Sequence, residues 1–144
     1  MRYLLFFTLI SCTMPATDAQ NPADHTWKHR ILLIFSPSQQ TAEYRGQLDQ
    51  LRADPTGLQD RDLLMYRIFP EGLITSERDV LDHNDLSDQY RSQYGVDPET
   101  FTVVLVGKDG TEKLRTNQVL RTDRLYATID AMPMRRRELR EQGQ

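Results

Sequence analysis

The sequence predicts an α/β domain folded as a three-layer sandwich, with the element order β-α-β-α-β-β-α. Three short runs are almost continuously apolar, as in strands that are covered on both faces: residues 31–35, 63–69 and 101–106. Charged segments with apolar residues at helical spacing lie between them. The turn Lys108-Asp109-Gly110 then leads from the last run into a more polar strand, which indicates an antiparallel hairpin at the sheet edge.

The first half of the domain predicts a strand, a helix and a second strand. The first apolar run ends at Ser36-Pro37-Ser38, and the next helix is predicted within residues 39–53. Its apolar stripe consists of Tyr44, Leu48 and Leu51, and residues 54–57 are expected to end it. Because a strand–helix–strand crossover is right-handed, we expect the first two strands to be parallel.

The second half is less regular, and residues 73–84 give no pattern that assigns an element. A helix is predicted over residues 85–94, with Gly95 as its left-handed cap. We expect Thr122 to cap the last helix and Pro133 to interrupt it. Its buried face is predicted to hold Leu125, Ile129 and Met132.

A parallel pair of strands joined to an antiparallel hairpin, with helices on both sides, is the thioredoxin arrangement. The 144 residues are enough for one such domain and too few for two. We expect the domain to span residues 28–144, after a polar leader at residues 20–27. Hydrophobic residues make up 38% of the chain and charged residues 27%, which excludes a disordered or polytopic membrane protein. The net charge of -3 predicts no nucleic-acid partner.

The N-terminal residues predict export. Residues 1–19 have the pattern of a signal peptide, with Arg2, an apolar stretch and a small-residue cleavage site that ends at Ala19. Cleavage would give a periplasmic or secreted protein without a transmembrane span. In the alternative interpretation, residues 9–12 form a lipobox and the protein is a lipoprotein anchored to the membrane through Cys12. Both interpretations remove or acylate the single cysteine, so the folded domain has no free thiol.

Four stretches carry a resemblance to a known family. They are residues 28–38, 94–96, 106–110 and 129–138, of which the Asp-Ala-Met-Pro-Met-Arg segment from Asp130 is the most specific. Together they resemble the domain of unknown function family DUF4174, which is described as peroxiredoxin-like or thioredoxin-like and also occurs in secreted animal proteins with sushi repeats. The resemblance covers roughly residues 27–140. It implies a thioredoxin-like fold and export, and it implies no established activity.

The loop after the first strand is the candidate ligand-binding site. Thioredoxin-type oxidoreductases place a pair of cysteines there, where the helix N-terminus lowers the pKa of the nucleophile. This chain has Ser36, Ser38, Gln39 and Gln40 instead, so thiol exchange is excluded. These side chains suit helix capping; the alternative is that the loop binds an anion or a ligand carboxylate through its backbone N–H groups.

The substrate-docking proline of thioredoxins has no clear counterpart. Thr102 occupies the expected position before the third strand, and Pro98 lies four residues earlier. The sequence therefore does not predict substrate docking against a proline, as in thioredoxins. Thr102 is a further candidate ligand contact, in addition to the four loop residues.

The remaining polar groups predict no metal and no cofactor. His25 and His29 are four residues apart beside Asp24, but their segment has no helical pattern. His83 is interpreted as solvated. Two further groups are expected to be structural.

Asp60, Arg61 and Asp62 are expected to form ion pairs at the surface or at the strand end. The cluster of Arg135, Arg136, Arg137 and Arg140 is expected to be a solvated helix face, with docking of an acidic partner as the alternative.

These observations favour a non-catalytic module that binds a protein or a small ligand in the cell envelope, and they assign no catalytic residue. The alternative is a peroxiredoxin-like enzyme that works without cysteine, from the loop at residues 36–40. The sequence does not indicate an oligomeric state.

Overall fold

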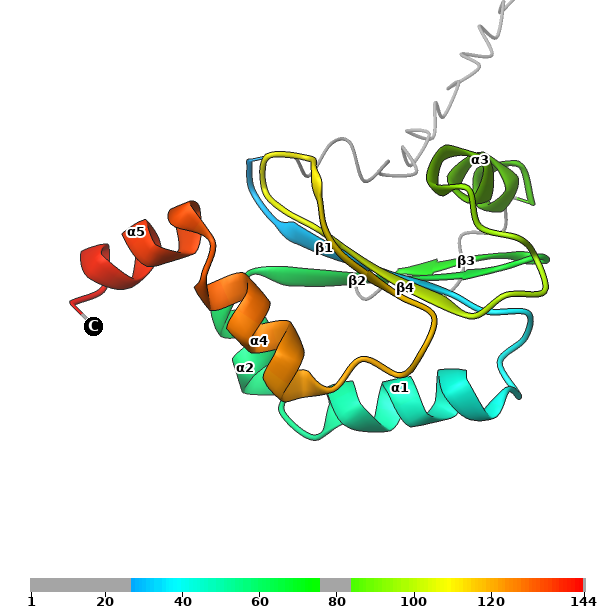
Figure 1. Ribbon diagram of the computed structural model, residues 1–144, viewed down its shortest axis with the longest axis horizontal. Coiled ribbons are helices and arrows are strands. Elements are labelled where there is room, and N and C mark those ends of the chain that lie inside the picture. Colours follow the sequence, from blue (N-terminus) through cyan, green and yellow to red (C-terminus); the bar gives the residue numbers. More distant parts are fainter. Residues whose placement is uncertain (1–26, 76–83, 144) are drawn as a thin grey trace, which may run out of the picture.

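The computed structural model describes residues 27–75 and 84–143. Within these ranges the chain forms a mixed α/β fold around a five-stranded sheet with the order β3-β2-β1-β4-β5 (Figure 1). The strands are β1 (Arg30–Phe35), β2 (Leu63–Phe69), β3 (Gly72–Thr75), β4 (Thr102–Val106) and β5 (Glu112–Thr116). The helices are α1 (Ala42–Arg52), α2 (Pro55–Asp60), α3 (Asn84–Tyr94), α4 (Thr122–Asp130) and α5 (Pro133–Glu141).

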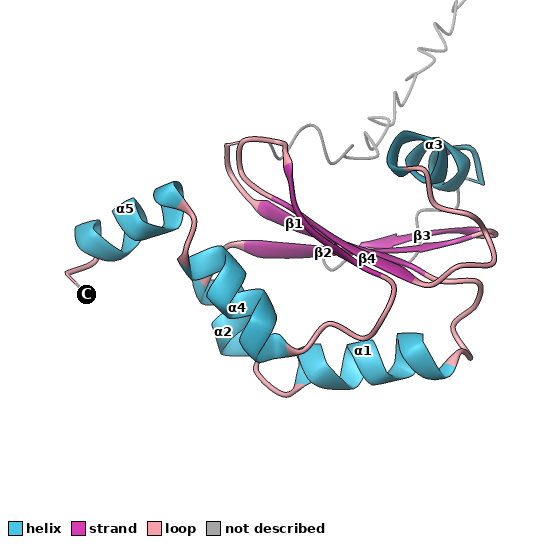
Figure 2. Ribbon diagram, in the orientation of Figure 1, coloured by secondary structure: helices cyan, strands magenta, loops and turns pink. Residues whose placement is uncertain are grey.

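The centre of the sheet confirms the predicted pairing. β1 is parallel to β2, with Leu33 opposite Tyr66, and antiparallel to β4, with Leu33 opposite Val104. β4 and β5 form the predicted antiparallel hairpin, which has an irregular register at Leu105 and Val106. Helices α1, α2 and α4 lie on one side of the sheet and α3 on the other (Figure 2). The chain therefore has helices on both faces of a mixed sheet.

Each face of the sheet has its own apolar core, and β1 contributes to both. Leu32 and Ile34 belong to the cluster on the side of α1 and α4, whereas Leu33 and Phe35 belong to the cluster on the side of α3. All six residues of β1 are buried, because successive side chains of a strand point to opposite faces and both faces are covered. This explains why the run has no polar alternation.

Two short elements were not predicted. Residues 54–57 end α1 as expected, but the same residues begin α2: Asp54 accepts a 2.9 Å hydrogen bond from the backbone N–H of Gly57, and Pro55 is at the first turn. β3 begins at Gly72, just before the region that gave no pattern, and pairs antiparallel with β2. At six and four residues, these elements are too short to show a period.

The C-terminal segment differs from the predicted single helix. Pro133 interrupts it as expected, but α5 follows as a separate helix. The expected capping by Thr122 is wrong: Arg121 is at the N-cap position, and the Thr122 hydroxyl instead donates to the carbonyl oxygen of Gln50 at 2.9 Å. Leu125, Ile129 and Met132 are buried as predicted. Gly95, which directly follows α3, has the predicted left-handed conformation, with φ of 61°.

No helix in the described ranges is long and apolar enough to cross a bilayer. The predicted signal peptide at residues 1–19, Cys12, His25 and His83 lie outside the described residues. So does all of the predicted leader except Trp27.

Candidate functional site

The loop at residues 36–41, which joins β1 to α1, is held by its own hydroxyl groups. The buried Ser36 donates from Oγ to the carbonyl oxygen of Ser38 at 2.8 Å, and its Oγ lies 2.9 Å from Oγ1 of Thr41. Thr41 is the N-cap of α1 and accepts a 3.4 Å hydrogen bond from the N–H of Tyr44. Oγ of Ser38 accepts from the N–H of Gln40 at 3.2 Å. The hydroxyls therefore shape the turn that leads into the helix.

The predicted site residues gather at one end of the sheet but on different sides of it. Gln39 and Gln40 are exposed in the loop. Thr102 is buried and lies opposite Phe35 in the β1–β4 pair, so it adjoins the start of the loop. Because Thr102 shares the face of Phe35, it lies on the α3 side of the sheet, whereas α1 lies on the other side.

Arg91 is a residue of this region that the sequence analysis missed. It is 4% exposed on α3, and its guanidinium donates to the carbonyl oxygens of Ser36 at 2.9 Å, Ile68 at 3.2 Å and Asp97 at 3.1 Å. Burial lowers the pKa of Arg91, and nearby carboxylates, first Asp88, partly oppose this. Arg91 thus ties the start of the loop to the ends of β1 and β2.

The chemistry available to the loop is hydrogen bonding. The hydroxyls of Ser36, Ser38 and Thr41 contact backbone groups and one another, and no carboxylate or imidazole of the described residues accepts from them. A serine nucleophile needs an adjacent base to take its proton. Among the described residues, the loop hydroxyls therefore have no adjacent base of the kind that nucleophilic attack requires.

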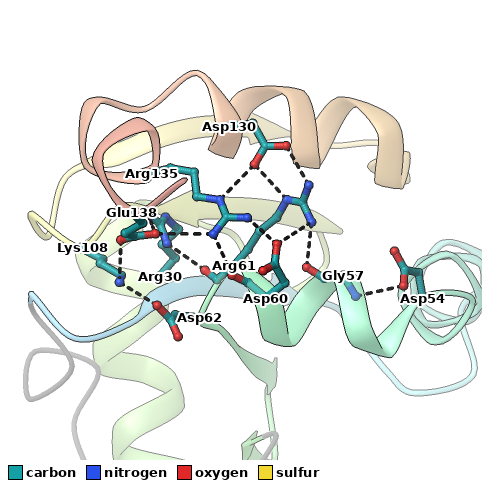
Figure 3. Close-up of polar contacts among 10 residues, drawn as sticks. All are labelled: Arg30, Asp54, Gly57, Asp60, Arg61, Asp62, Lys108, Asp130, Arg135 and Glu138. Carbon is teal, nitrogen blue, oxygen red and sulfur yellow. Dashed lines mark hydrogen bonds and ion pairs between the residues drawn. The ribbon is translucent and has the colours of Figure 1, made fainter. Parts of the chain in front are cut away.

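A partly buried charge network lies at the opposite end of β1 (Figure 3). We call it the charge network; its members are Arg30, Asp60, Arg61, Asp62, Lys108, Asp130, Arg135 and Glu138. Glu138 of α5 accepts from Arg30 at 3.1 Å and from Lys108 at 2.8 Å. Arg30 at the start of β1 is fully buried, so Glu138 fastens α5 to the sheet.

The other half of the charge network joins α2, α4 and α5. Arg135 pairs with Asp60 and, at 3.3 Å, with Asp130. Arg61 pairs with Asp130 at 2.7 Å, and its guanidinium carbon lies 3.9 Å from the centre of the Tyr126 ring. Four cations and four carboxylates make up the network, so its formal charge is zero.

The network lowers the pKa of two carboxylates. Burial alone would raise the pKa of Glu138, but hydrogen bonds from Lys108 and Arg30 outweigh burial and lower it. The pKa of Asp130 is likewise lowered, with Arg61 and Arg135 outweighing burial. Beside them, burial and then the charge of Asp54 raise the pKa of Tyr126 to about 12.

These contacts correct one prediction and confirm another. Arg135 was expected on a solvated face, and this is wrong: it is 1% exposed, whereas Arg136, Arg137 and Arg140 are exposed. The reason is that α5 begins anew at Pro133 and turns Arg135 toward Asp60. Asp60, Arg61 and Asp62 do form the ion pairs expected at the strand end.

Among the described residues, no group of three or more histidine, cysteine, aspartate or glutamate side chains is placed to hold a metal ion. His29 is within the described ranges, whereas its predicted companion His25 is not.

The chain is similar to parts of several larger animal proteins. It is 27% identical to sushi repeat-containing protein SRPX2 of Xenopus laevis and 30% identical to sushi repeat-containing protein SRPX of Rattus norvegicus. It is 29% identical to coiled-coil domain-containing protein 80 of Danio rerio. Each match covers 78% of this chain, but only 25% of the two sushi-repeat proteins and 15% of the zebrafish protein. The chain therefore spans a quarter or less of the length of these relatives.

A family model described as a domain of unknown function (DUF4174) matches residues 21–138. The match includes every described strand and all of the charge network. The chain belongs to the DUF4174 family.

Proposed function

We propose that this chain is an exported, thioredoxin-like binding module that carries out no thiol chemistry. The order β2-β1-β4-β5 supports the thioredoxin-like assignment, because it combines a parallel β1–β2 pair, joined across helix α1, with an antiparallel β4–β5 hairpin. In this interpretation β3 is an addition at the β2 edge. The functional domain comprises residues 28–144.

One observation carries the proposal: the loop between β1 and α1 holds hydroxyl and amide side chains where an oxidoreductase needs a thiolate. The sole cysteine of the sequence is Cys12, which precedes the domain. A hydroxyl cannot form a mixed disulfide, and the three loop hydroxyls are already engaged in the turn. These facts also argue against the cysteine-independent enzyme.

The ligand contacts in this proposal are Ser36, Ser38, Gln39, Gln40 and Thr102. The exposed amides of Gln39 and Gln40 can both donate and accept hydrogen bonds, which suits a protein or a small polar ligand. Ser36 and Thr102 are buried and would act by holding the backbone at this end of the sheet.

Export is proposed from the sequence pattern of residues 1–19. Cleavage after Ala19 would release the domain into the periplasm or the medium with residues 20–27 as its leader. Lipidation of Cys12 would hold the same domain at a membrane face. Both routes leave the domain outside the cytoplasm.

Turnover assays test the absence of catalysis. We expect the exported protein, without a free Cys12 thiol, to reduce insulin disulfides with dithiothreitol, and to consume hydrogen peroxide, at the rate of the buffer alone. Iodoacetamide treatment should change neither rate. Turnover above the buffer rate that disappears in Ser38→Ala, at an unchanged melting temperature, would contradict the proposal and favour the enzyme.

A further inference from the structure

A groove lies between α1, α2 and β2, and its lining residues belong to neither the loop nor the charge network. Its volume is about 240 Å³, and it is lined by Leu48, Leu51, Arg52, Pro55, Leu58, Met65 and Arg67. An apolar cavity of about 150 Å³ already admits benzene, so the groove has room for a small organic molecule. A second hollow, beside Lys108 in the charge network, measures about 30 Å³, roughly the size of a water site.

The walls of the groove are mainly aliphatic. Leu48 and Leu51 come from the C-terminal half of α1 and belong to the core cluster on that side of the sheet. Leu58 of α2 and Met65 of β2 pack against this cluster and are only partly buried. The open part of the groove therefore exposes apolar surface that a ligand could cover.

The charged residues of the lining are both cations. Arg52 is in the last turn of α1, is exposed, and makes no ion pair with any residue in the described ranges. Arg67 is two residues after Met65 in β2, so both side chains lie on the same face of the strand. Among the residues that the structure describes, no acidic side chain lines the groove. An apolar wall beside the exposed guanidinium of Arg52 is complementary to a molecule with an aliphatic body and one anionic end.

We propose that this groove binds an aliphatic carboxylate of about six to eight carbons. The hydrocarbon chain covers Leu48, Leu58 and Met65, and the carboxylate meets the guanidinium group of Arg52. Arginine suits this role because its planar fork donates two parallel hydrogen bonds to a carboxylate. The site is separate from residues 36–40, so it adds a ligand class that does not depend on the proposed role of the loop.

Titration calorimetry on the full chain tests the proposal with octanoate, hexanoate, acetate and octanol as probes. We expect saturable binding of octanoate, about fifteenfold weaker binding of hexanoate because about fourfold is lost for each of the two missing methylenes, and no binding of acetate. Octanol should bind at least tenfold more weakly than octanoate, because it lacks the anionic end. Amide chemical shifts should move in α1, α2 and β2.

The matched variants are Arg52→Gln and Arg45→Gln, two changes on α1 of which only the first is in the groove. Arg52→Gln should weaken octanoate binding about tenfold, which corresponds to the loss of one charge-assisted hydrogen bond. Arg45→Gln should leave it unchanged. The proposal is overturned if octanoate does not saturate, if octanol binds equally well, if both variants behave alike, or if the shifts fall in other elements.

Discussion

Arg30 and Arg135 are nearly inaccessible to solvent, although a buried guanidinium is costly unless its donors and its charge are matched. Arg30 donates to both oxygens of Glu138 and to the carbonyl oxygen of Arg61. Arg135 donates to the side chain and the backbone of Asp60 and to Asp130. The network therefore offsets much of the cost of burial, although Nε of Arg30 has no hydrogen-bond partner among the described residues, and it ties the C-terminal helix to the sheet.

Replacing Arg135 with methionine should lower the free energy of unfolding by about 2 kcal/mol. Removing one partner of a fully buried ion pair costs about 3–5 kcal/mol. We expect a smaller loss for Arg135 because its partners Asp60 and Asp130 are 42% and 35% exposed and remain partly solvated. Urea denaturation measures the loss. Arg136→Met, at the exposed neighbouring position, is the control and should change stability by less than about 0.5 kcal/mol. Equal effects of the two changes would refute the buried role of Arg135.

The stabilisation by Glu138 should depend on pH. Its pKa is lowered in the folded protein, so the unfolded chain takes up the proton first as the pH falls. The contribution of Glu138 is therefore fully present above its unfolded pKa of about 4.3 and is lost as the pH falls through the lower folded value.

Denaturation of the native protein and of Glu138→Gln between pH 7 and pH 2.5 measures this dependence. We expect the stability difference between them to be largest at pH 7 and to shrink below about pH 4. Glu141→Gln changes an exposed carboxylate of the same helix and should show no such trend. A difference that stays constant with pH would show that the charge of Glu138 is not what stabilises the fold.

Sequence analysis located the loop after β1 and predicted the ion pairs at the strand end. It could not determine the direction in which individual arginine side chains point. The stretches that carry the family resemblance supply Arg30, Lys108, Asp130, Arg135 and Glu138, which meet only in the folded chain. Arg135 looked like one of three adjacent solvated arginines because helix phase is unknown until the start of α5 at Pro133 is fixed. Arg91 was missed because its partners are backbone carbonyls, which leave no sequence pattern.

At the scale of elements, replacing either of two helical glycines with alanine should change the stability of the protein, and the two changes should have opposite signs. A Cβ at Gly46 in α1 would meet only Val119, at 3.5 Å, so Gly46→Ala should stabilise the protein by about 0.5–1 kcal/mol through helix propensity. A Cβ at Gly57 in α2 would collide with the Asp54 carboxylate and lie 2.6 Å from the Tyr126 hydroxyl. Displacing Asp54 removes the cap of α2, so Gly57→Ala should destabilise by about 1 kcal/mol.

Melting temperatures and urea midpoints of the two alanine variants measure this contrast. Each variant is the control for the other, because both replace a helical glycine with alanine and only the surroundings of the new methyl group differ. If both variants gain stability, the close packing of α2 against Asp54 and Tyr126 is not as the structure has it.

The elements that the sequence predicted are those with a strong physical signal. β1, β2 and β4 each contain a run of mainly apolar residues because both faces of the sheet are covered, and α1 and α4 have clear apolar stripes. α2 and β3 depend on contacts that the sequence does not show. α2 depends on a cap and on packing against Tyr126, and β3 depends on pairing with β2.

At the scale of the molecule, β1 connects two polar regions at its opposite ends. Beyond its C-terminal end is the loop with Ser36, held by Arg91 and by its own hydroxyls. At its N-terminal end is the charge network around Arg30. The network is neutral and its members are paired with one another, whereas the loop exposes Gln39 and Gln40. In the function that we propose, the loop is therefore the recognition surface and the network stabilises the fold.

The central claim, that the exported protein is a thioredoxin-like module without a thiol, is tested most directly by counting thiols. The exported protein should be unfolded in guanidinium and titrated with 5,5'-dithiobis(2-nitrobenzoate), with the unprocessed precursor, which retains Cys12, as the positive control. We predict one thiol per chain in the precursor and none in the exported protein. One reactive thiol per exported chain would contradict the claim.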